Sequence, residues 1–108
     1  KIPSNILLID PVGYLDMILL QLNCKFIITD SGGMQKESYF AQKNCYVLRN
    51  NTEWIELVKN KHSILIKNDY KKLLKKNKFN SNFKNKYYGT GNTAKKITDL
   101  IIKYAKTI

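Results

Sequence analysis

Short apolar runs alternate along this chain with longer stretches in which apolar side chains recur every three or four residues. The short runs are typical of strands buried on both faces, and the longer pattern is typical of helices packed on a sheet. Strands are predicted at residues 5–9, 26–29, 45–48 and 63–66. Helices are predicted at residues 14–22, 33–43, 53–59, 69–76 and 92–106, with a loop at 77–91. The alternation predicts an α/β fold with a parallel sheet, right-handed crossovers and helices on both faces.

Two of the predicted helices begin after a capping residue, and the last predicted helix has an apolar face. Thr52 and Asn68 are good capping residues, and each precedes a predicted helix. The apolar face of the last helix consists of Ala94, Ile97, Ile101, Tyr104 and Ala105. We expect that face to pack against another part of the protein.

The first three predicted strands are each followed by a polar or glycine-containing segment. These segments are residues 10–14, 29–33 and 49–53. Parallel strands end at the same edge of a sheet, and ligands of open α/β sheets bind outside that edge. We therefore expect the three segments to converge on one ligand, of the nucleotide type.

The segment Thr29-Asp30-Ser31-Gly32-Gly33 turns a predicted strand into a predicted helix. Glycine lets the backbone approach a ligand closely, Ser31 offers a hydroxyl, and the free amides of a helix N-terminus attract anions. This corner suits a phosphate, and the Glu37 carboxylate further along the helix suits the hydroxyls of a ribose. An ordinary helix cap whose glycines serve only the turn has the same sequence, so this segment alone leaves both interpretations open.

The length of 108 residues and the hydrophobic content of 44% limit the chain to one domain with a modest core. No apolar stretch reaches the roughly 20 residues that cross a bilayer, and no secretion signal is recognised, so we expect a soluble cytoplasmic protein. Cys24 and Cys45 lack the spacing of a metal site and are expected to be buried free thiols. His62 is expected at the surface, away from the ligand edge.

The net charge of +11 makes nucleic acid a candidate partner. Of the 19 basic residues, 13 follow residue 60, and Arg49 is the only arginine. Lysines spread among asparagines are typical of a solvated face, whereas specific base contacts mostly use arginine. Nucleic acid is therefore not the expected partner, although a basic, non-enzymatic binding module stays an alternative.

Four blocks of the sequence resemble the non-hydrolysing UDP-N-acetylglucosamine 2-epimerases in order and spacing. They are Ile9-Asp10-Pro11 with Tyr14-Leu15, Thr29-Asp30-Ser31-Gly32-Gly33 with Gln35 and Glu37, Val47-Leu48-Arg49 with Thr52-Glu53, and Tyr88-Gly89-Thr90-Gly91. The resemblance implies two facing Rossmann-like domains in the GT-B arrangement, with UDP mostly on the C-terminal domain. It places residues 1–108 in the distal part of that nucleotide-binding domain, with the N-terminal domain absent.

The resemblance also implies roles for individual residues. The matching positions are Ser31, Gly32 and Gly33 at the diphosphate, Glu37 at the ribose hydroxyls, and Val12 and Met17 near the uracil. The catalytic carboxylates of the family lie in the N-terminal domain, so no catalytic residue is expected in this chain, and no metal or cofactor. The expected partners are a UDP-sugar, the N-terminal domain and a second subunit of a homodimer, without nucleic acid or membrane.

Several positions depart from the family pattern. Trp54 follows Thr52-Glu53 where an arginine is usual, which is more like relatives acting on UDP-diacetamido-glucuronic acid. The other departures are Lys36, Gln42, Asn44 and Thr90. They mark either a divergent subfamily or a decaying gene, and they leave the sugar open. The nucleotide lobe of a GT-B glycosyltransferase is a further alternative.

Overall fold

A three-stranded parallel sheet forms the centre of the protein. The computed structural model describes residues 1–84 and 86–108. Strands β1 (Phe26–Thr29), β2 (Asn44–Val47) and β3 (Ser63–Leu65) are hydrogen-bonded in the order β1-β2-β3, with Ile28 opposite Tyr46. The predicted parallel α/β sheet is confirmed, with three strands in the described chain where the sequence predicts four.

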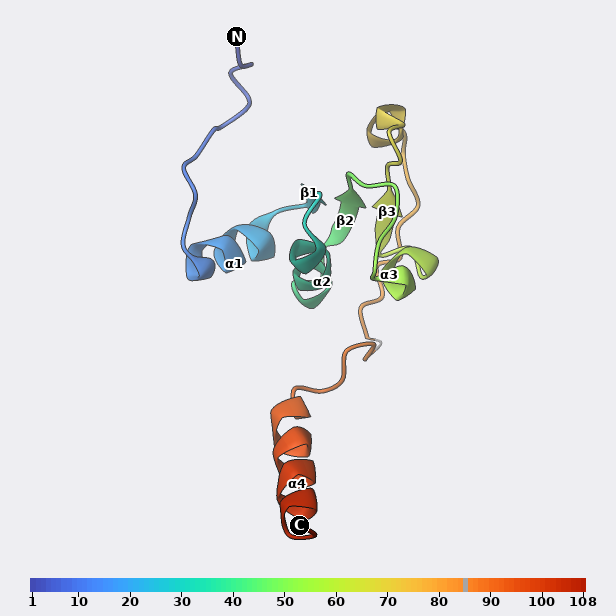
Figure 1. The fold of residues 1–108 in the computed structure, drawn as a ribbon. Coiled ribbons are helices and arrows are strands. Elements are labelled where there is room, and N and C mark those ends of the chain that lie inside the picture. Colours follow the sequence, from blue (N-terminus) through green and yellow to red (C-terminus); the bar gives the residue numbers. More distant parts are fainter. Residues whose placement is uncertain (85) are drawn as a thin grey trace.

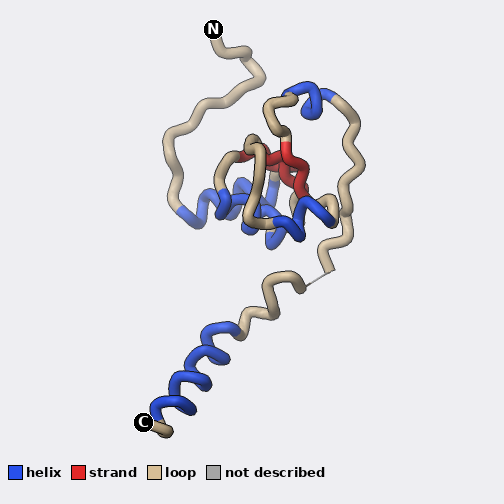
Figure 2. Tube along the Cα trace, turned by 45° about the vertical axis from the view of Figure 1, so that its right-hand side comes forward, coloured by secondary structure: helices blue, strands red, loops and turns tan. Residues whose placement is uncertain are grey.

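Helices connect and flank the strands (Figure 1). They are α1 (Tyr14–Asn23), α2 (Gly32–Phe40), α3 (Ile55–Lys59), the 3₁₀ helix η1 (Tyr70–Leu74) and α4 (Thr93–Ala105). Helix α2 packs on β1 and β2, and α3 packs on β3. Because the strands follow one another in order across the sheet, right-handed crossovers place α2 and α3 on the same face. Both helices lie below the strands in Figure 2.

The core lies between the sheet and these two helices. The fully buried apolar side chains are Cys45, Val47, Leu57 and Ile66. Cys45 shares a face of β2 with Val47, and its thiol interacts with Ser38 of α2. Burial raises the pKa of the Cys45 thiol to about 11, so the thiol stays protonated. Both cysteines are free thiols, as predicted, although Cys24 is only half-buried.

The opposite face of the sheet carries Tyr46 and is partly covered by a loop. Asn77 donates a hydrogen bond from Nδ2 to the Tyr46 hydroxyl (3.1 Å), and the Phe79 ring lies 5.1 Å from the Tyr46 ring. Phe26 and Ile28 are nevertheless 49% and 46% exposed. The helical cover that the sequence predicts for both faces is therefore incomplete on this one.

Residues 5–9 do not form a strand, contrary to the sequence prediction. They make no ladder hydrogen bond in the described chain, and the side chains at residues 6–9 are 53–85% exposed. Figure 1 shows this segment running from α1 toward the N-terminus, away from the sheet. A strand is stable only when neighbouring strands satisfy its backbone groups. Strands β1, β2 and β3 thus leave the apolar side chains of residues 6–9 exposed.

Two helix starts also differ from the prediction. Asn68 has a φ of 62°, in the left-handed region, so it cannot take the extended conformation of an N-cap. The chain then forms the short helix η1 where an α-helix at 69–76 was predicted. Thr52 accepts a hydrogen bond from the Trp54 amide (3.1 Å), but α3 begins only at Ile55, so Thr52 closes a turn before the helix.

Helix α4 extends away from the sheet (Figures 1 and 2), and none of its residues is buried. On its apolar face, Ile97, Ile101 and Tyr104 are 51–64% exposed. The packing partner predicted for this face is therefore not found in the described chain. Within residues 1–84 and 86–108, no helix combines the length and apolar character needed to pass through a bilayer.

Candidate functional site

The turn between β1 and α2 is a capped helix start. Ser31 is the N-cap, and its Oγ accepts a hydrogen bond from the Met34 amide (3.3 Å). The Ser31 amide donates to Thr29 Oγ1 (3.1 Å). In the described chain, the amides of Gly32 and Gly33 donate no hydrogen bond. These two N–H groups are available to an anion, which the helix dipole favours at this end.

The two glycines of this turn have different surroundings. Neither has a positive φ, so the backbone conformation does not itself require glycine. A Cβ at Gly32 would overlap Oε1 of Glu53, whereas a Cβ at Gly33 would meet only Ser31 Oγ, at 3.9 Å, among the described residues. Gly32 thus makes room for a side chain of the protein, and Gly33 leaves open space beside the free amides. The predicted place of both glycine amides at a diphosphate stays a prediction.

Side-chain hydrogen bonds tie the segment after β2 to the first turn of α2. The Trp54 indole donates from Nε1 to the Gly32 carbonyl (2.7 Å), and the Thr52 hydroxyl donates to Gln35 Oε1 (2.6 Å). Gln35 is fully buried and also donates from Nε2 to the Ser31 carbonyl (3.3 Å). Residues 29–33 and 49–53 thus lie together as expected, and their convergence on one ligand stays a prediction.

Sequence reasoning assigned no site role to Gln35 or Trp54, although the sequence contains a signal for each. Polar side chains at 31, 35 and 38 recur at helical spacing, which marks a polar face of α2. The Ser38 hydroxyl indeed donates to the Gln35 carbonyl (2.7 Å) on that face. Trp54 is the only tryptophan, and its N–H needs an acceptor when it is covered.

An ion pair lies against the same helix start. Arg49 Nη1 is 3.1 Å from Glu53 Oε2, and the two side chains are 31% and 51% exposed. Both side chains reach Gly32, because Glu53 Oε1 overlaps the position of a Cβ there and Arg49 Nη1 lies 3.7 Å from that position. A carboxylate and a guanidinium therefore flank the first residue of α2.

Lys36 links this region to aromatic rings. Its Nζ lies 4.8 Å from the centre of the Tyr88 ring and 5.1 Å from a ring of Trp54, a cation–π arrangement. The Trp54 and Tyr88 rings meet edge to face at 5.5 Å. Burial, followed by interaction with Glu56, raises the pKa of the Tyr88 hydroxyl, which therefore stays neutral. The ammonium of Lys36 is thus held beside the rings.

Glu37 lies one helical turn from Gly33 and on the same side of α2. Its Oε2 accepts a hydrogen bond from Gln21 Nε2 of α1 (2.8 Å). The carboxylate lines a cavity of about 180 Å³ between α1 and α2, together with Tyr14 and Ile18. Because the open space at Gly33 and the Glu37 carboxylate share one side of α2, an extended ligand can reach both.

The residues expected near a base lie on α1 or just before it. Met17 is half-buried in α1, and Val12 precedes that helix in a segment without regular structure. In the described chain, neither is hydrogen-bonded to the corner at residues 31–33. Residues 10–14 do not follow a strand, and of this segment Tyr14 reaches the cavity beside Glu37. Base recognition by Val12 and Met17 stays a prediction.

An aromatic cluster surrounds His62 at the opposite end of the sheet. His62 is 1% exposed, so the expectation of a surface residue is wrong. Its ring lies 4.8 Å from that of Phe83 and 5.0 Å from that of Tyr39. Neither ring nitrogen has a hydrogen-bond partner in the described chain, and burial lowers the pKa of His62 below its ordinary value of 6.5. The cover comes from a distant loop, which local sequence does not reveal.

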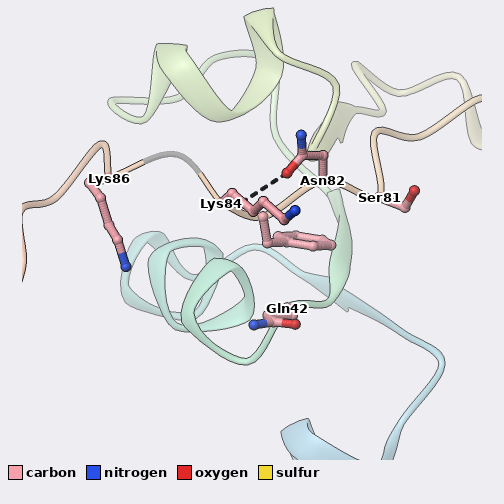
Figure 3. A pocket seen from close by; sticks show the side chains of 6 residues that line it. Gln42, Ser81, Asn82, Lys84 and Lys86 are labelled. Carbon is pink, nitrogen blue, oxygen red and sulfur yellow. Dashed lines mark hydrogen bonds between the residues drawn. The ribbon is translucent and has the colours of Figure 1, made fainter.

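A hollow of about 700 Å³ also lies at this end, far from Ser31 along α2. It is lined by Gln42, Ser81, Asn82, Phe83, Lys84 and Lys86 (Figure 3). The side chains of Lys84 and Lys86 lie on different sides of the hollow and do not converge on one point (Figure 3). Gln42 follows the C-terminus of α2, where the helix carbonyls disfavour an anion. The hollow therefore does not compete with the Ser31 corner as an anion site.

Known proteins match this chain over most of its length. A sequence profile described as UDP-N-acetylglucosamine 2-epimerase matches residues 1–102. A protein of Methanococcus maripaludis named UDP-N-acetylglucosamine 2-epimerase homolog is 48% identical over 101 residues, covering 91% of this chain and 28% of that protein. The UDP-N-acetylglucosamine 2-epimerase of Methanocaldococcus jannaschii is 37% identical over 111 residues, covering 98% of this chain and 30% of that protein.

One shorter match and one solved structure add to this. A UDP-2,3-diacetamido-2,3-dideoxy-D-glucuronate 2-epimerase of Pseudomonas aeruginosa is 56% identical over 50 residues, 46% of this chain and 14% of that protein. The crystal structure of the M. jannaschii UDP-GlcNAc 2-epimerase with UDP-GlcNAc and UDP aligns with a TM-score of 0.66 at 31% identity, over 88% of this chain and 27% of that one. The chain thus spans less than a third of these relatives. Given the profile match and the shared fold, it belongs to the UDP-N-acetylglucosamine 2-epimerase family.

Proposed function

We propose that this chain is the UDP-binding part of a non-hydrolysing UDP-N-acetylglucosamine 2-epimerase. The observation that carries the proposal is the pair of free amides at Gly32 and Gly33, with open space at Gly33 and a position at the carboxyl edge of the sheet. Membership of the epimerase family supports it, and so does the similar M. jannaschii structure, which contains UDP-GlcNAc and UDP.

In this proposal the nucleotide lies along one side of α2. The diphosphate accepts hydrogen bonds from the two glycine amides and from the Ser31 hydroxyl, and the ribose hydroxyls donate to Glu37. Gly33 and Glu37 are four residues apart, so about 6 Å of helix separates them, a span that fits a ribose next to a diphosphate. The uracil then lies toward α1, where the Met17 thioether can pack on it.

The proposed reaction inverts the carbon that bears the acetamido group and converts UDP-N-acetylglucosamine to its manno isomer. A base removes the proton of that carbon, UDP leaves, and UDP adds back after a proton has returned on the opposite face. Negative charge grows on the diphosphate as its bond to the sugar breaks, and preorganised amides stabilise that charge. One helix end contributes about 0.3 to 2 kcal/mol, which is too little for the whole reaction.

The acid and the base are therefore assigned to the rest of a longer protein. We expect an N-terminal domain that faces this one and a homodimer of the complete enzyme, acting in the cytoplasm on precursors of cell-surface polysaccharide. Residues 1–108 alone are expected to bind UDP without epimerising the sugar. UDP-diacetamido-glucuronate is the second candidate substrate, because the 56% identity to the P. aeruginosa enzyme is the highest of the matches described above.

Calorimetry with UDP tests the binding proposal, and Gly33→Ala is the informative variant. A Cβ at Gly33 has room in the protein but occupies the open space beside the amides. We expect unchanged or slightly higher thermal stability, because alanine favours a helix by up to about 1 kcal/mol over glycine, together with UDP binding at least tenfold weaker, roughly the cost of one charged hydrogen bond. Absence of heat with the folded parent chain, or full affinity in Gly33→Ala, would contradict the proposal.

The reaction itself is tested on the complete protein. In heavy water, conversion of UDP-N-acetylglucosamine should place deuterium on the inverted carbon, which proton NMR detects. Transfer of the sugar to an acceptor without inversion would instead support the glycosyltransferase alternative.

A further inference from the structure

We propose that Arg49 and Glu53 form an exchangeable ion pair at this site. When a nucleoside diphosphate binds, Arg49 releases the Glu53 carboxylate and takes a phosphate oxygen in its place. The inference rests on the proposed function. It adds one positively charged side chain to the diphosphate site and identifies Glu53 as an internal competitor of the phosphate.

Arg49 is placed to reach a ligand at the corner. It follows β2 at the carboxyl edge of the sheet, and its Nη1 lies 3.7 Å from the Cβ position of Gly32, next to the free amides. It is also the only arginine of the chain. The neighbouring Lys36 is engaged with the Trp54 and Tyr88 rings. Arg49 is therefore the cationic side chain that stands beside the first residue of α2.

The contact between Arg49 and Glu53 uses one nitrogen. Nη1 lies 3.1 Å from Oε2 and 3.4 Å from Oε1 of Glu53, and no contact of Nη2 or Nε is found in the described chain. The pair thus lacks the two parallel hydrogen bonds that make arginine–carboxylate pairs strong. It is a partly exposed pair four residues apart, a class whose contribution is small. A phosphate, which accepts two guanidinium bonds at once, is a stronger partner.

Glu53 cannot stay where it is when a phosphate binds. Its Oε1 packs against Gly32, so a diphosphate on the adjacent amides would meet a like charge at close range. The Glu53 side chain is 51% exposed, which lets it swing into solvent without disturbing the core. In the free protein the same carboxylate lies at the N-terminus of α2, where its negative charge interacts favourably with the helix dipole, as a phosphate would.

The test is a double-mutant cycle on the chain of residues 1–108, with UDP affinity measured by calorimetry. Glu53→Gln should tighten UDP binding about two- to fivefold, because it removes the competitor. Arg49→Gln should weaken binding about tenfold, the usual effect of losing a charged hydrogen bond. In the Arg49→Gln background, Glu53→Gln should tighten binding clearly less, because only the like charge is then removed and no longer the competition for the guanidinium. Thermal unfolding of each variant shows that the fold is kept.

Several outcomes would overturn the exchange. If Glu53→Gln weakens UDP binding or leaves it unchanged, Glu53 is not a competitor. If it tightens binding equally with and without Arg49, Glu53 acts only through its field, and the pair does not exchange. Should Arg49→Gln fail to fold, Arg49→Lys keeps the charge and must still lose several-fold in UDP affinity, because an ammonium lacks the two parallel N–H donors of a guanidinium. A parent chain that binds no UDP would remove the proposed function itself, which is a separate result.

Discussion

The two ends of α2 contact the rest of the protein in different ways. At the first turn, directional hydrogen bonds join Gln35 to Thr52 and Gly32 to Trp54, and two amides stay open. Near the last turn, Tyr39 packs among aromatic rings, one of which is the His62 ring, whose nitrogens have no partner in the described chain. Directional hydrogen bonds thus hold the first turn of α2, whereas burial of apolar rings holds its last turn.

We interpret this difference as one between the proposed UDP-binding corner and a surface that stabilises the fold. A binding corner needs exact placement and access to solvent, which hydrogen bonds provide. The aromatic end instead fastens the loop after η1 to the sheet, a task for which ring area suffices. Tyr88 touches both ends, because its ring lies 5.5 Å from Trp54 and 5.9 Å from Tyr39. The comparison predicts that each end can be damaged with only a limited effect on the other.

The largest effect is expected at the aromatic end. Tyr39 is 6% exposed and its ring contacts those of His62, Phe83 and Tyr88. Tyr39→Ala should lower the free energy of unfolding by about 3–5 kcal/mol, because a large buried ring is replaced by a cavity. Urea denaturation measures this loss, and UDP affinity of the remaining folded protein should change less than threefold, about 0.7 kcal/mol.

Tyr39→Phe is the matched control, since it keeps the ring and removes the hydroxyl. It should cost no more than about 1.5 kcal/mol, the net value of a hydrogen bond. An equal loss in both variants would mean that the hydroxyl rather than the ring area stabilises this end.

The polar end is tested by Thr52→Val, which has nearly the same shape but no hydroxyl. It leaves Gln35 Oε1, on a fully buried side chain, without its 2.6 Å partner and should cost about 1–3 kcal/mol in urea denaturation. UDP binding should weaken as well, because Gln35 also bonds the Ser31 carbonyl. Thr52→Ser keeps the hydroxyl, so its stability and its UDP affinity should be close to those of the parent chain. Parent-like affinity in a destabilised Thr52→Val would show that the network does not position the corner.

Local sequence predicts those elements whose partners lie close along the chain. The period of apolar residues locates α1, α2 and the strands of the sheet to within a few residues, although most apolar side chains of α1 are exposed in the described chain. The run at 5–9 fails, since it pairs with no strand of the described chain and its side chains stay exposed. Residues 69–76 fail for a different reason: Asn68 adopts a left-handed conformation, and the chain continues as a 3₁₀ helix.

The candidate site was only partly predictable for a similar reason. The serine, the two glycines and Glu37 follow from local chemistry at a helix start. The contact between Gly32 and Glu53 joins residues 21 positions apart, and the Trp54 bond to Gly32 spans 22. His62 is covered by Phe83, another 21 positions away. No local pattern encodes such contacts, so the separate roles of the glycines and the burial of the histidine emerge only from the fold.

The smallest effect expected is a pH dependence at the aromatic end. Burial lowers the pKa of His62 from its ordinary 6.5, and the Asn80 backbone offsets part of this shift. The unfolded chain then binds more protons than the folded one below about pH 6.5, so the contribution to stability is complete above that pH and is lost as pH falls through the lowered pKa. Burial raises the pKa of the neighbouring Tyr39 above its ordinary value of 10.0, so its hydroxyl does not titrate in this range.

Urea denaturation between about pH 8 and pH 5 measures the slope, and His62→Phe, which keeps a ring in the cluster, should flatten it. The effect is the smallest of the three because the loop can open locally and let the ring reach water without unfolding the sheet. Because the His62 cluster lies far from the Ser31 corner, the pH dependence of UDP affinity should be the same in the parent chain and in His62→Phe. If His62→Phe keeps the full slope, other groups cause it, and if stability rises on acidification, the imidazole is charged within the fold. The second result would show that the aromatic end contains a polar partner for the imidazole and resembles the Ser31 corner after all.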